Sequence, residues 1–428
     1  MRRILLLGSL TYLLLLGGLA TLNREVLVLA IPLLVYLAAT LPFGPDGLRL
    51  RVVRSVSPDR TVEGIPVTVR LSITNEGSAL EQLLVKDLVP PRLKVERGAP
   101  LAAAALGPGE SLEMEYTLQS RRGTYTLENV EVTAGDLLGL SQRTAMLAQP
   151  CQLTVLPQVV RLRRLAIRPL RTRGHAGPVP ARQGGSGTDF YGVREYQVGD
   201  PRRWINWRVS ARHGSALFTN EFQQERIADV GLILDARARS DVQLAEDSLL
   251  EHAIQATASL ADTLLRDGNR VGLLIFGTAV DWTFPAYGKV QRERILRALS
   301  RAHPGESQVF EDLAYLPTRL FSAGSQLVLV SPVSSNDLSV LQHLRARGYQ
   351  LLVIRPDPVS FEMQSLVPEA PVQLAARILR AERALMRCRL QHAGVQVVDW
   401  PVDRPLDQVI HASLGRVPPW FRSVAVEP

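Results

Sequence analysis

The hydrophobic pattern begins with two long apolar runs near the N-terminus. Residues 4–22 contain no charged side chain, and neither do residues 26–43. As an α-helix each run is roughly 28 Å long, close to the ~30 Å hydrocarbon core of a bilayer. A short polar turn with Asn23, Arg24 and Glu25 separates the two runs. The pattern predicts a transmembrane helical hairpin over residues 1–45.

The charges that flank this hairpin predict its orientation. Arg2 and Arg3 precede the first run, Arg49 and Arg51 follow the second, and the turn holds one arginine. By the positive-inside rule, both ends lie in the cytoplasm. We therefore expect a multi-pass protein of the plasma membrane whose soluble domains are cytoplasmic. A cleaved signal peptide, with small residues at positions 18 and 20, is the alternative.

Residues 50–156 change to a period of two. Residues 67–75 alternate, and similar short runs cover 83–88, 111–118, 123–133 and 152–156, with glycine- and proline-rich turns between them. This spacing predicts a small antiparallel β-sandwich of immunoglobulin type. The carboxylates of this region are scattered and it has no histidine, so we interpret it as a spacer or interaction module.

Residues 227–415 alternate between strand and helix patterns. Apolar strands are expected at 229–234, 271–276, 326–330, 350–354 and 395–398, and residues 281–284 suit an antiparallel edge strand. Helical patterns cover 244–265, 290–299, 338–347 and 372–393. The order predicts an α/β domain with a doubly wound, mostly parallel sheet, followed by a tail at 416–428. Ligands bind such sheets beyond the carboxyl ends of the strands, where Asp235 stands.

Charge singles out residues 157–226 as a basic connector. Between positions 161 and 226 there are 13 arginines and five acidic residues, and 13 − 5 = +8 equals the net charge of the whole chain. The first part of the connector looks like a loop, with a glycine-rich run at 184–187. The two cysteines, Cys151 and Cys388, lie far apart, which excludes a disulfide scaffold and fits a reducing compartment.

Aromatic and basic residues interleave in the second part of the connector. Trp204 and Trp207 are three positions apart, a spacing that places side chains on one face of a helix. An acidic protein surface, or anionic lipid near the anchor, fits the arginines around them. Nucleic acid uses the same residue types, through phosphate contacts and base stacking, but fits a membrane-anchored chain less well.

The stretch VGLILDARARSD, residues 230–241, resembles the first metal-binding loop of the von Willebrand factor A domain, in which an aspartate opens an Asp-x-Ser-x-Ser site. Asp235 matches that aspartate, but Arg237 and Arg239 occupy both serine positions. Ser331 stands where the resemblance implies a second aspartate, and the loop near 305–312 offers Ser307 but no threonine. Only Asp235 would then remain of the metal ligands.

A divalent cation needs several hard oxygen ligands. A guanidinium about 5 Å from such an ion costs roughly 6 kcal/mol at an effective dielectric constant near 20. We therefore expect a degenerate site without metal, and no other cofactor. In one interpretation the arginines are solvated loop residues, and Asp235 is satisfied by backbone amides or a neighbouring arginine. In the other, Asp235, Arg237 and Arg239 are partner-binding residues, and the arginines grip a partner's carboxylate.

A wider resemblance covers nearly the whole chain. Residues 121–140 and 190–214 resemble the bacterial domain-of-unknown-function fifty-eight family, whose signature reads Tyr-x-x-Gly-Asp-x-x-Arg-x-Ile-x-Trp-x-x-x-Ala-Arg. It is matched by Tyr196, Gly199, Asp200, Arg203, Ile205, Trp207, Ala211 and Arg212. Members of that family are typically encoded beside MoxR-type AAA+ ATPases. The resemblance implies a protein partner of that kind and a role in ATPase-driven assembly or remodelling.

The sequence offers little for an enzyme. It has no phosphate-binding Gly-x-x-x-x-Gly-Lys loop and no Gly-x-Ser-x-Gly elbow, and its histidines are dispersed. We therefore expect no catalytic residue and predict a membrane-anchored, protein-binding adaptor. The alternative is a cryptic envelope-associated hydrolase or transferase that uses residues 189–212. An enzyme would gather Asp189, Glu195 and Asp200 in a pocket, whereas an adaptor would hold them in internal ion pairs.

Overall fold

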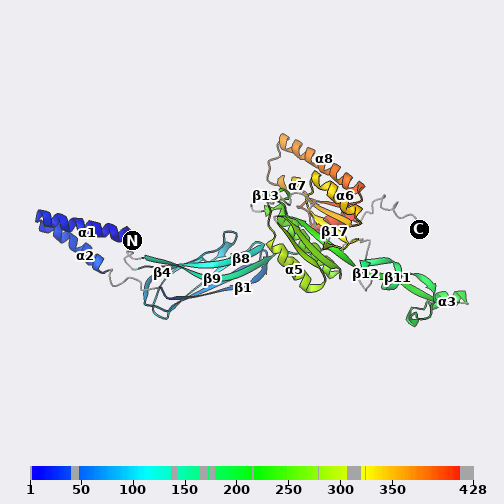
Figure 1. The fold of residues 1–428 in the computed structure, drawn as a ribbon, viewed down its shortest axis with the longest axis horizontal. Coiled ribbons are helices and arrows are strands. Elements are labelled where there is room, and N and C mark those ends of the chain that lie inside the picture. The colour runs from blue at the N-terminus through cyan, green and yellow to red at the C-terminus, as the bar shows by residue number, and fades with distance from the viewer. Residues whose placement is uncertain are drawn as a thin grey trace. The chain divides into compact units, whose positions relative to one another are not determined.

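A computed structural model describes residues 2–39, 48–135, 142–163, 172–173, 179–214, 216–245, 247–277, 279–305, 320–322 and 324–414. The chain divides into two compact units, Met1–Leu156 and Pro157–Pro428 (Figure 1). Each unit has a hydrophobic core of its own. The result is a mixed α/β protein with antiparallel and parallel sheets, as the sequence predicts.

Two helices, α1 (Arg2–Thr21) and α2 (Arg24–Ala39), form a hairpin at the N-terminus. The turn lies where the polar residues predict it: the Asn23 N–H donates to the Gly18 carbonyl, and Asn23 Oδ1 accepts from the Glu25 N–H. Gly18 allows the helices to approach closely, because a Cβ there would lie 2.8 Å from the Leu27 side chain. Within the described residues, no helix has both the length and the apolar character needed to cross a membrane. The predicted transmembrane hairpin is therefore not confirmed.

The rest of the first unit consists of two sheets. One has the order β1-β3-β7-β5, with β1 (Leu50–Ser57), β3 (Val67–Asn75), β7 (Ser111–Gln119) and β5 (Lys94–Arg97). The other has the order β2-β9-β8-β4-β6, with β2 (Arg60–Val62), β9 (Gln142–Leu156), β8 (Gly123–Gly135), β4 (Leu80–Asp87) and β6 (Leu101–Leu106). All neighbouring pairs are antiparallel except β2 and β9. Alternate side chains of both sheets meet in one core, as the period-two pattern predicts.

A buried polar group joins these two sheets. Asp87 on β4 accepts hydrogen bonds from Arg54 on β1 (2.5 Å) and from the Tyr116 hydroxyl on β7 (2.7 Å). Arg54 also donates to the carbonyls of Leu127, Gln149 and Asn129 on the sheet that holds β4. Burial and the hydrogen bond to Asp87 raise the pKa of Tyr116 above its ordinary value. The period-two pattern of residues 50–156 does not predict this group.

The second unit is built on a central sheet of order β16-β15-β12-β17-β18-β19. Its strands are β16 (Val280–Ala286), β15 (Arg270–Phe276), β12 (Phe218–Asp235), β17 (Gln326–Val330), β18 (Gln350–Pro356) and β19 (Gln396–Trp400). Neighbours are parallel except β15 and β16, so residues 280–286 form the antiparallel edge strand that the sequence predicts.

Helices cover both faces of this sheet. Ile233 and Val353 share a core cluster with Leu341 of α6 (Leu338–Ala346) and Leu390 of α8 (Ala370–His392). Leu232 and Leu352, which alternate with them to the other face, are equally buried. The helix α4 (Leu249–Arg266) contacts β12, β15, β17 and β18, and α5 (Gly288–Arg301) contacts α4. The unit also contains α7 (Pro358–Glu362) and α9 (Leu406–Leu414).

The strand β12 crosses the domain boundary that the sequence predicts, because it runs unbroken through residues 226 and 227. Its second half lies in the central sheet, and its first half pairs with β11 (Val179–Glu195) in an antiparallel arm that carries α3 (Trp207–His213). The glycine-rich run at 184–187 lies within β11 rather than in a loop, so that prediction is wrong. Register shifts between Ala181 and Gly192 accommodate the glycines.

Candidate functional site

The carboxyl ends of β12 and β17 bring a buried polar cluster together. Because these strands are adjacent and parallel, their ends meet at one edge of the sheet. β12 ends at Asp235 and leads into a short 3₁₀ turn, η3 (Ala238–Ser240), while β17 leads through Ser331 into another, η6 (Ser335–Asp337). We call Asp235, Arg237, Ser240, Ser331 and Asp337 the crest cluster. All five residues are buried.

Arg237 binds two carboxylates with two hydrogen bonds each. Its Nε and Nη2 donate to the two oxygens of Asp235 at 2.8 and 2.7 Å. Its Nη1 and Nη2 donate to the two oxygens of Asp337 at 2.9 and 3.1 Å. A planar guanidinium can serve two carboxylates along two of its edges in this way, and an ammonium group cannot.

Two serines of the cluster and the neighbouring Ser334 donate further hydrogen bonds to the carboxylates. Ser240 Oγ and Ser331 Oγ donate to Asp235 Oδ2 at 2.7 and 2.6 Å. The backbone N–H and the hydroxyl of Ser334 donate to Asp337 Oδ2 at 2.9 and 3.0 Å. Buried charges are tolerated when they are paired and hydrogen-bonded in this manner, so the geometry is that of a completed structural site.

These contacts set the ionisation of the cluster. Burial by itself lowers the pKa of Arg237, but the hydrogen bonds to Asp235 and Asp337 outweigh it and hold the pKa above its ordinary value. Burial raises the pKa of Asp337, but the hydrogen bonds and the charge of Arg237 outweigh it and hold the pKa below its ordinary value. The Arg237–Asp337 pair therefore stays ionised throughout the neutral range.

The structure corrects both interpretations for Arg237, but not for Arg239. Arg237 is 3% exposed, so it is neither a solvated loop residue nor a side chain directed at a partner. Asp235 is satisfied by the Arg237 backbone amide and guanidinium, as the first interpretation expected of it. Arg239 alone reaches the surface, with its side chain 36% exposed and Nη2 3.5 Å from Asp337 Oδ1.

The cluster also contains an aspartate that the sequence analysis missed. The resemblance to the A domain implies a second carboxylate directly after β17, where Ser331 stands, but that carboxylate comes six residues later as Asp337. Val333, which has a left-handed backbone (φ 51°), and η6 lie in the segment that returns Asp337 to Arg237. The available signal was the Ser-x-x-Asp spacing of residues 334–337, a capping box in which Asp337 Oδ2 accepts from the Ser334 N–H.

A divalent cation does not fit this arrangement. The Arg237 guanidinium lies between the two carboxylates that would be its ligands, and both serine hydroxyls donate to Asp235. Among the described residues, no three His, Cys, Asp or Glu side chains converge to form a metal site. Ser307, expected in the third loop of such a site, lies outside the described residues.

A second buried arginine lies at the end of the neighbouring strand β18. Arg355 is 1% exposed, and its Nη1 lies 3.1 Å from Asp399 Oδ1 without the alignment of a hydrogen bond. Its other contacts are long ones to carbonyls, 3.5 Å to Pro332 and 3.3 Å to Arg383. Burial and the charge of Arg383 lower the pKa of Arg355 to about 10.

The signature residues form the end of the β11–β12 arm, and we call residues 196–217 the signature loop. Asp200 accepts two hydrogen bonds from Arg194, at 2.7 and 2.8 Å, and one from the Gln197 N–H at 2.9 Å. The hydrogen bonds from Arg194 and Gln197 hold the pKa of Asp200 below its ordinary value. Ile205 pairs with Thr219 of β12, and the Tyr196 N–H donates to the Leu217 carbonyl. Gly199 has a left-handed backbone (φ 112°) that favours glycine at this turn.

The two tryptophans of the signature loop do not share a helical face, so that prediction is wrong. Trp204 ends a 3₁₀ turn, η2 (Arg202–Trp204), and Arg203 lies 5.9 Å from the centre of its ring. Trp207 begins α3, which is capped by the Asn206 side chain, and is 66% exposed. In the same helix Arg208, Ala211 and Arg212 are also exposed.

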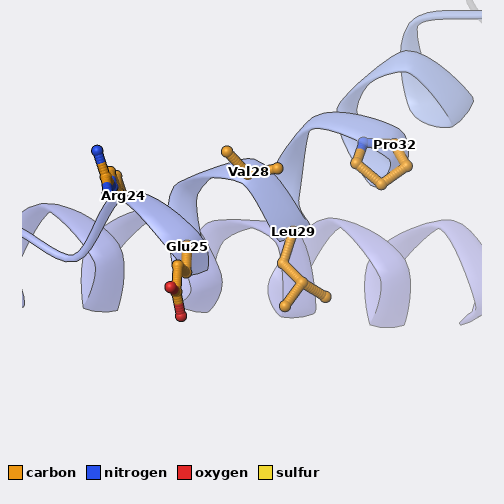
Figure 2. A pocket seen from close by; sticks show the side chains of 5 residues that line it. All are labelled: Arg24, Glu25, Val28, Leu29 and Pro32. Atoms are coloured by element: carbon orange, nitrogen blue, oxygen red, sulfur yellow. The ribbon is translucent and has the colours of Figure 1, made fainter.

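The acidic residues of the alternative enzyme are not shown to converge. Asp200 is held in an internal pair with Arg194, the arrangement that the adaptor prediction requires of it. Glu195 is exposed, and the side chain of Asp189 lies outside the described residues. A pocket of about 560 Å³ is lined by Arg24, Glu25, Val28, Leu29 and Pro32 of α2 (Figure 2). It contains none of the residues in the crest cluster or the signature loop.

The comparisons with known proteins agree with the resemblance seen in the signature. Residues 192–361 match the protein family described as "Protein of unknown function DUF58". The chain is also 29% identical over 332 residues to the uncharacterized protein YeaD of Bacillus subtilis (strain 168), covering 75% of this chain and 79% of that one. The family match includes the signature loop and the crest cluster.

Similarity to solved structures is weak. The cupredoxin domain of amoB from Nitrosocaldus yellowstonii is 7% identical, with 26% of this chain and 88% of that chain covered and a TM-score of 0.19. The FixG-related protein from Vibrio parahaemolyticus is 15% identical, with 26% and 97% covered and a TM-score of 0.16. Scores this low carry no argument about fold or function.

Proposed function

We propose that the chain is a non-enzymatic, membrane-anchored cytoplasmic adaptor whose signature loop binds a MoxR-type AAA+ ATPase during assembly or remodelling of a complex. The observation that carries the proposal is the exposure of Trp207 beside Arg208 and Arg212 on a short capped helix. Tryptophan and arginine are the residues most enriched where binding energy concentrates in protein interfaces. A tryptophan can bury 150–250 Å² of surface, so its exposure calls for a partner.

The local structure orders the backbone that carries Trp207 before binding. Asn206 Oδ1 accepts from the Val209 N–H at 3.1 Å and caps the first turn of α3. Ser210 Oγ donates to the Asn206 carbonyl at 2.9 Å and accepts from the Phe218 N–H at 2.8 Å, which ties α3 to β12. A pre-ordered backbone loses less conformational entropy on binding, which favours recognition at this loop.

The crest cluster supports the same proposal. We infer an A-like fold for the second unit from its strand order and from the aspartate at the end of β12. A domains use that edge for protein ligands through a metal. Here the cation is part of the chain, since Arg237 pairs with Asp235 and Asp337. An adaptor of this kind is folded and competent without divalent ions.

The anchor is supported by the surface of the N-terminal hairpin. Large apolar side chains are exposed along both helices, among them Leu6, Leu13, Leu19, Leu29 and Val35. A contiguous apolar surface of this kind is costly in water and is satisfied by lipid. The arginines on either side of the hairpin favour a cytoplasmic location for the domains that follow.

The experiment is co-purification from membranes of the full-length chain, co-expressed with a MoxR-type ATPase. We expect the ATPase to be recovered with the wild-type chain. Trp207→Ala should weaken the interaction about 30-fold, the equivalent of about 2 kcal/mol at an interface centre. Trp282→Ala, on the exposed edge strand β16, is the matched control and should bind normally. Failure to recover the ATPase, or equal binding by Trp207→Ala, would contradict the proposal.

A further inference from the structure

The helix α8 packs on its domain through a narrow strip. It spans 23 residues, yet only Ala376 and Leu390 are buried, whereas α4 buries 14 of its 18 residues. Arg383 lies between these two, seven positions from each, and donates to the carbonyls of Pro332 and Pro356. Positions seven apart lie on one side of a helix, so these three residues define the inner face of α8.

The opposite face of α8 carries an exposed apolar stripe. We call Leu374, Ile378, Ala381, Leu385 and Cys388 the outer stripe; Leu374, Ile378 and Leu385 are each more than half exposed. Their spacing of four, three, four and three residues is the repeat by which one helix packs against another. With Ala376, Arg383 and Leu390 directed inward, the outer stripe lies on the solvent side of the helix. Figure 1 shows α8 along the outside of the second unit.

The charges beside the outer stripe are basic. Arg377 and Arg389 flank it, and in the described part of the chain neither forms an ion pair with a carboxylate. Glu382 is the single acidic residue of α8 and lies beside the stripe as well, so these flanking positions carry 2 − 1 = +1. A second copy of the same helix would bring two such positive surfaces together. An acidic helix would be attracted instead.

The shape of the outer stripe indicates that a helix, rather than a membrane surface, covers it. Helices that lie on membranes use a broad apolar face, often with aromatic residues. The outer stripe is a single seam without an aromatic residue. We infer that α8 binds an acidic amphipathic helix of a partner protein, which lays its own apolar seam along the outer stripe. This inference concerns a different surface from the signature loop and does not depend on the ATPase.

Cys388 provides a reporter within the stripe. It is exposed, and Cys151→Ser leaves it as the one cysteine of the chain. The measurement is the alkylation rate of Cys388 by a maleimide, on the full-length Cys151→Ser chain in detergent solution. The probe is a synthetic helix of about three heptads with leucine at the seam positions and glutamate beside them. A control peptide has lysine in place of every glutamate.

We expect the acidic peptide at saturation to slow alkylation at least about tenfold, and the lysine peptide to leave the rate unchanged. Ile378→Asp with Leu385→Asp should abolish this protection. Val290→Asp, which replaces an exposed apolar residue of α5, should retain it. Thermal unfolding of each variant verifies that the domain is folded.

Four results would overturn the inference. If both peptides protect Cys388 equally, or if neither protects it, an acidic helix is not the occupant of the stripe. Protection without peptide on reconstitution into phosphatidylglycerol vesicles, but not phosphatidylcholine vesicles, assigns the stripe to the membrane surface. Protection that rises with the concentration of the chain alone assigns it to a second copy. If Cys388 is alkylated slowly without peptide at every dilution of the chain, another segment of the same chain covers the outer stripe.

Discussion

Two arginines buried at the same edge of the central sheet have pKa values that are shifted in opposite directions. Arg237 follows β12 and Arg355 ends β18, and they are 3% and 1% exposed. The pKa of Arg237 is raised above its ordinary value, whereas that of Arg355 is lowered to about 10. Burial opposes the charge of both residues, so the difference arises from their partners.

The partners differ in geometry more than in number. Arg237 makes two-point hydrogen bonds to each of two buried aspartates. Arg355 shares the partly exposed Asp399 with Arg387, and lies beside another cation, Arg383. A buried cation is stabilised only where aligned acceptors replace its lost hydration. Arg237 therefore serves as a built-in counter-ion of the fold, and Arg355 does not.

The largest effect on stability is expected from substitutions of Arg237. Arg237→Ala leaves Asp235 and Asp337 buried without their cation, and removing one partner of a buried ion pair typically costs about 3–5 kcal/mol. We expect a loss of that size in the free energy of unfolding, measured by urea titration at neutral pH. Arg237→Lys should recover only part of it, because an ammonium group cannot make both two-point contacts.

The matched control for this variant is Arg239→Ala. Arg239 is partly exposed and 3.5 Å from Asp337, so its removal should cost less than about 1 kcal/mol. Equal losses in the two variants would show that Arg237 has no special position in the crest cluster.

Asp337→Asn should change how the free energy of unfolding depends on pH. The substitution keeps the shape of the side chain but removes the negative charge, and should cost about 1–3 kcal/mol at pH 7. The folded pKa of Asp337 is lowered, so its stabilising contribution is present above its unfolded pKa near 4 and is lost as pH falls through the lower, folded value. Urea titrations between about pH 2 and pH 7 should show this loss in the wild type and a flatter profile in Asp337→Asn. Identical profiles would contradict the assignment.

The smallest effect is expected at Arg355. Because its contacts are long or poorly aligned, a linear apolar side chain of similar length replaces little, and Arg355→Met should change the free energy of unfolding by about 1 kcal/mol or less in either direction. Thermal and urea unfolding beside Arg237→Met provide the measurement. A loss as large as that of Arg237→Met would remove the contrast between the two sites.

Periodicity predicted most of the fold because it depends on which side chains are buried. Residues 67–75 alternate because β3 faces one core, and residues 327–330 are apolar throughout because both faces of β17 are covered. The exposure of Trp207 could not be predicted in this way. The tryptophan spacing suits one helix, but the pairing of Ile205 with Thr219 of β12 separates the 3₁₀ turn η2 from the helix α3.

Of the two aspartates in the crest cluster, only Asp235 was predicted from the sequence. Asp235 follows directly from its place at the end of an apolar strand. Asp337 depends on the path of a loop with a left-handed residue at Val333, which no local pattern encodes. The role of Arg237 depends in turn on Asp337, since a single carboxylate would leave the guanidinium free to turn toward solvent.

Because Arg237 occupies the cation position at the edge of the sheet, the crest cluster should take up no divalent ion. The measurement is isothermal titration of the full-length chain in detergent solution, with magnesium and then calcium chloride at neutral pH. We expect no saturable heat with either ion, for the wild type and for Asp235→Ala alike. Stoichiometric uptake of either ion by the wild type, abolished in Asp235→Ala, would contradict it.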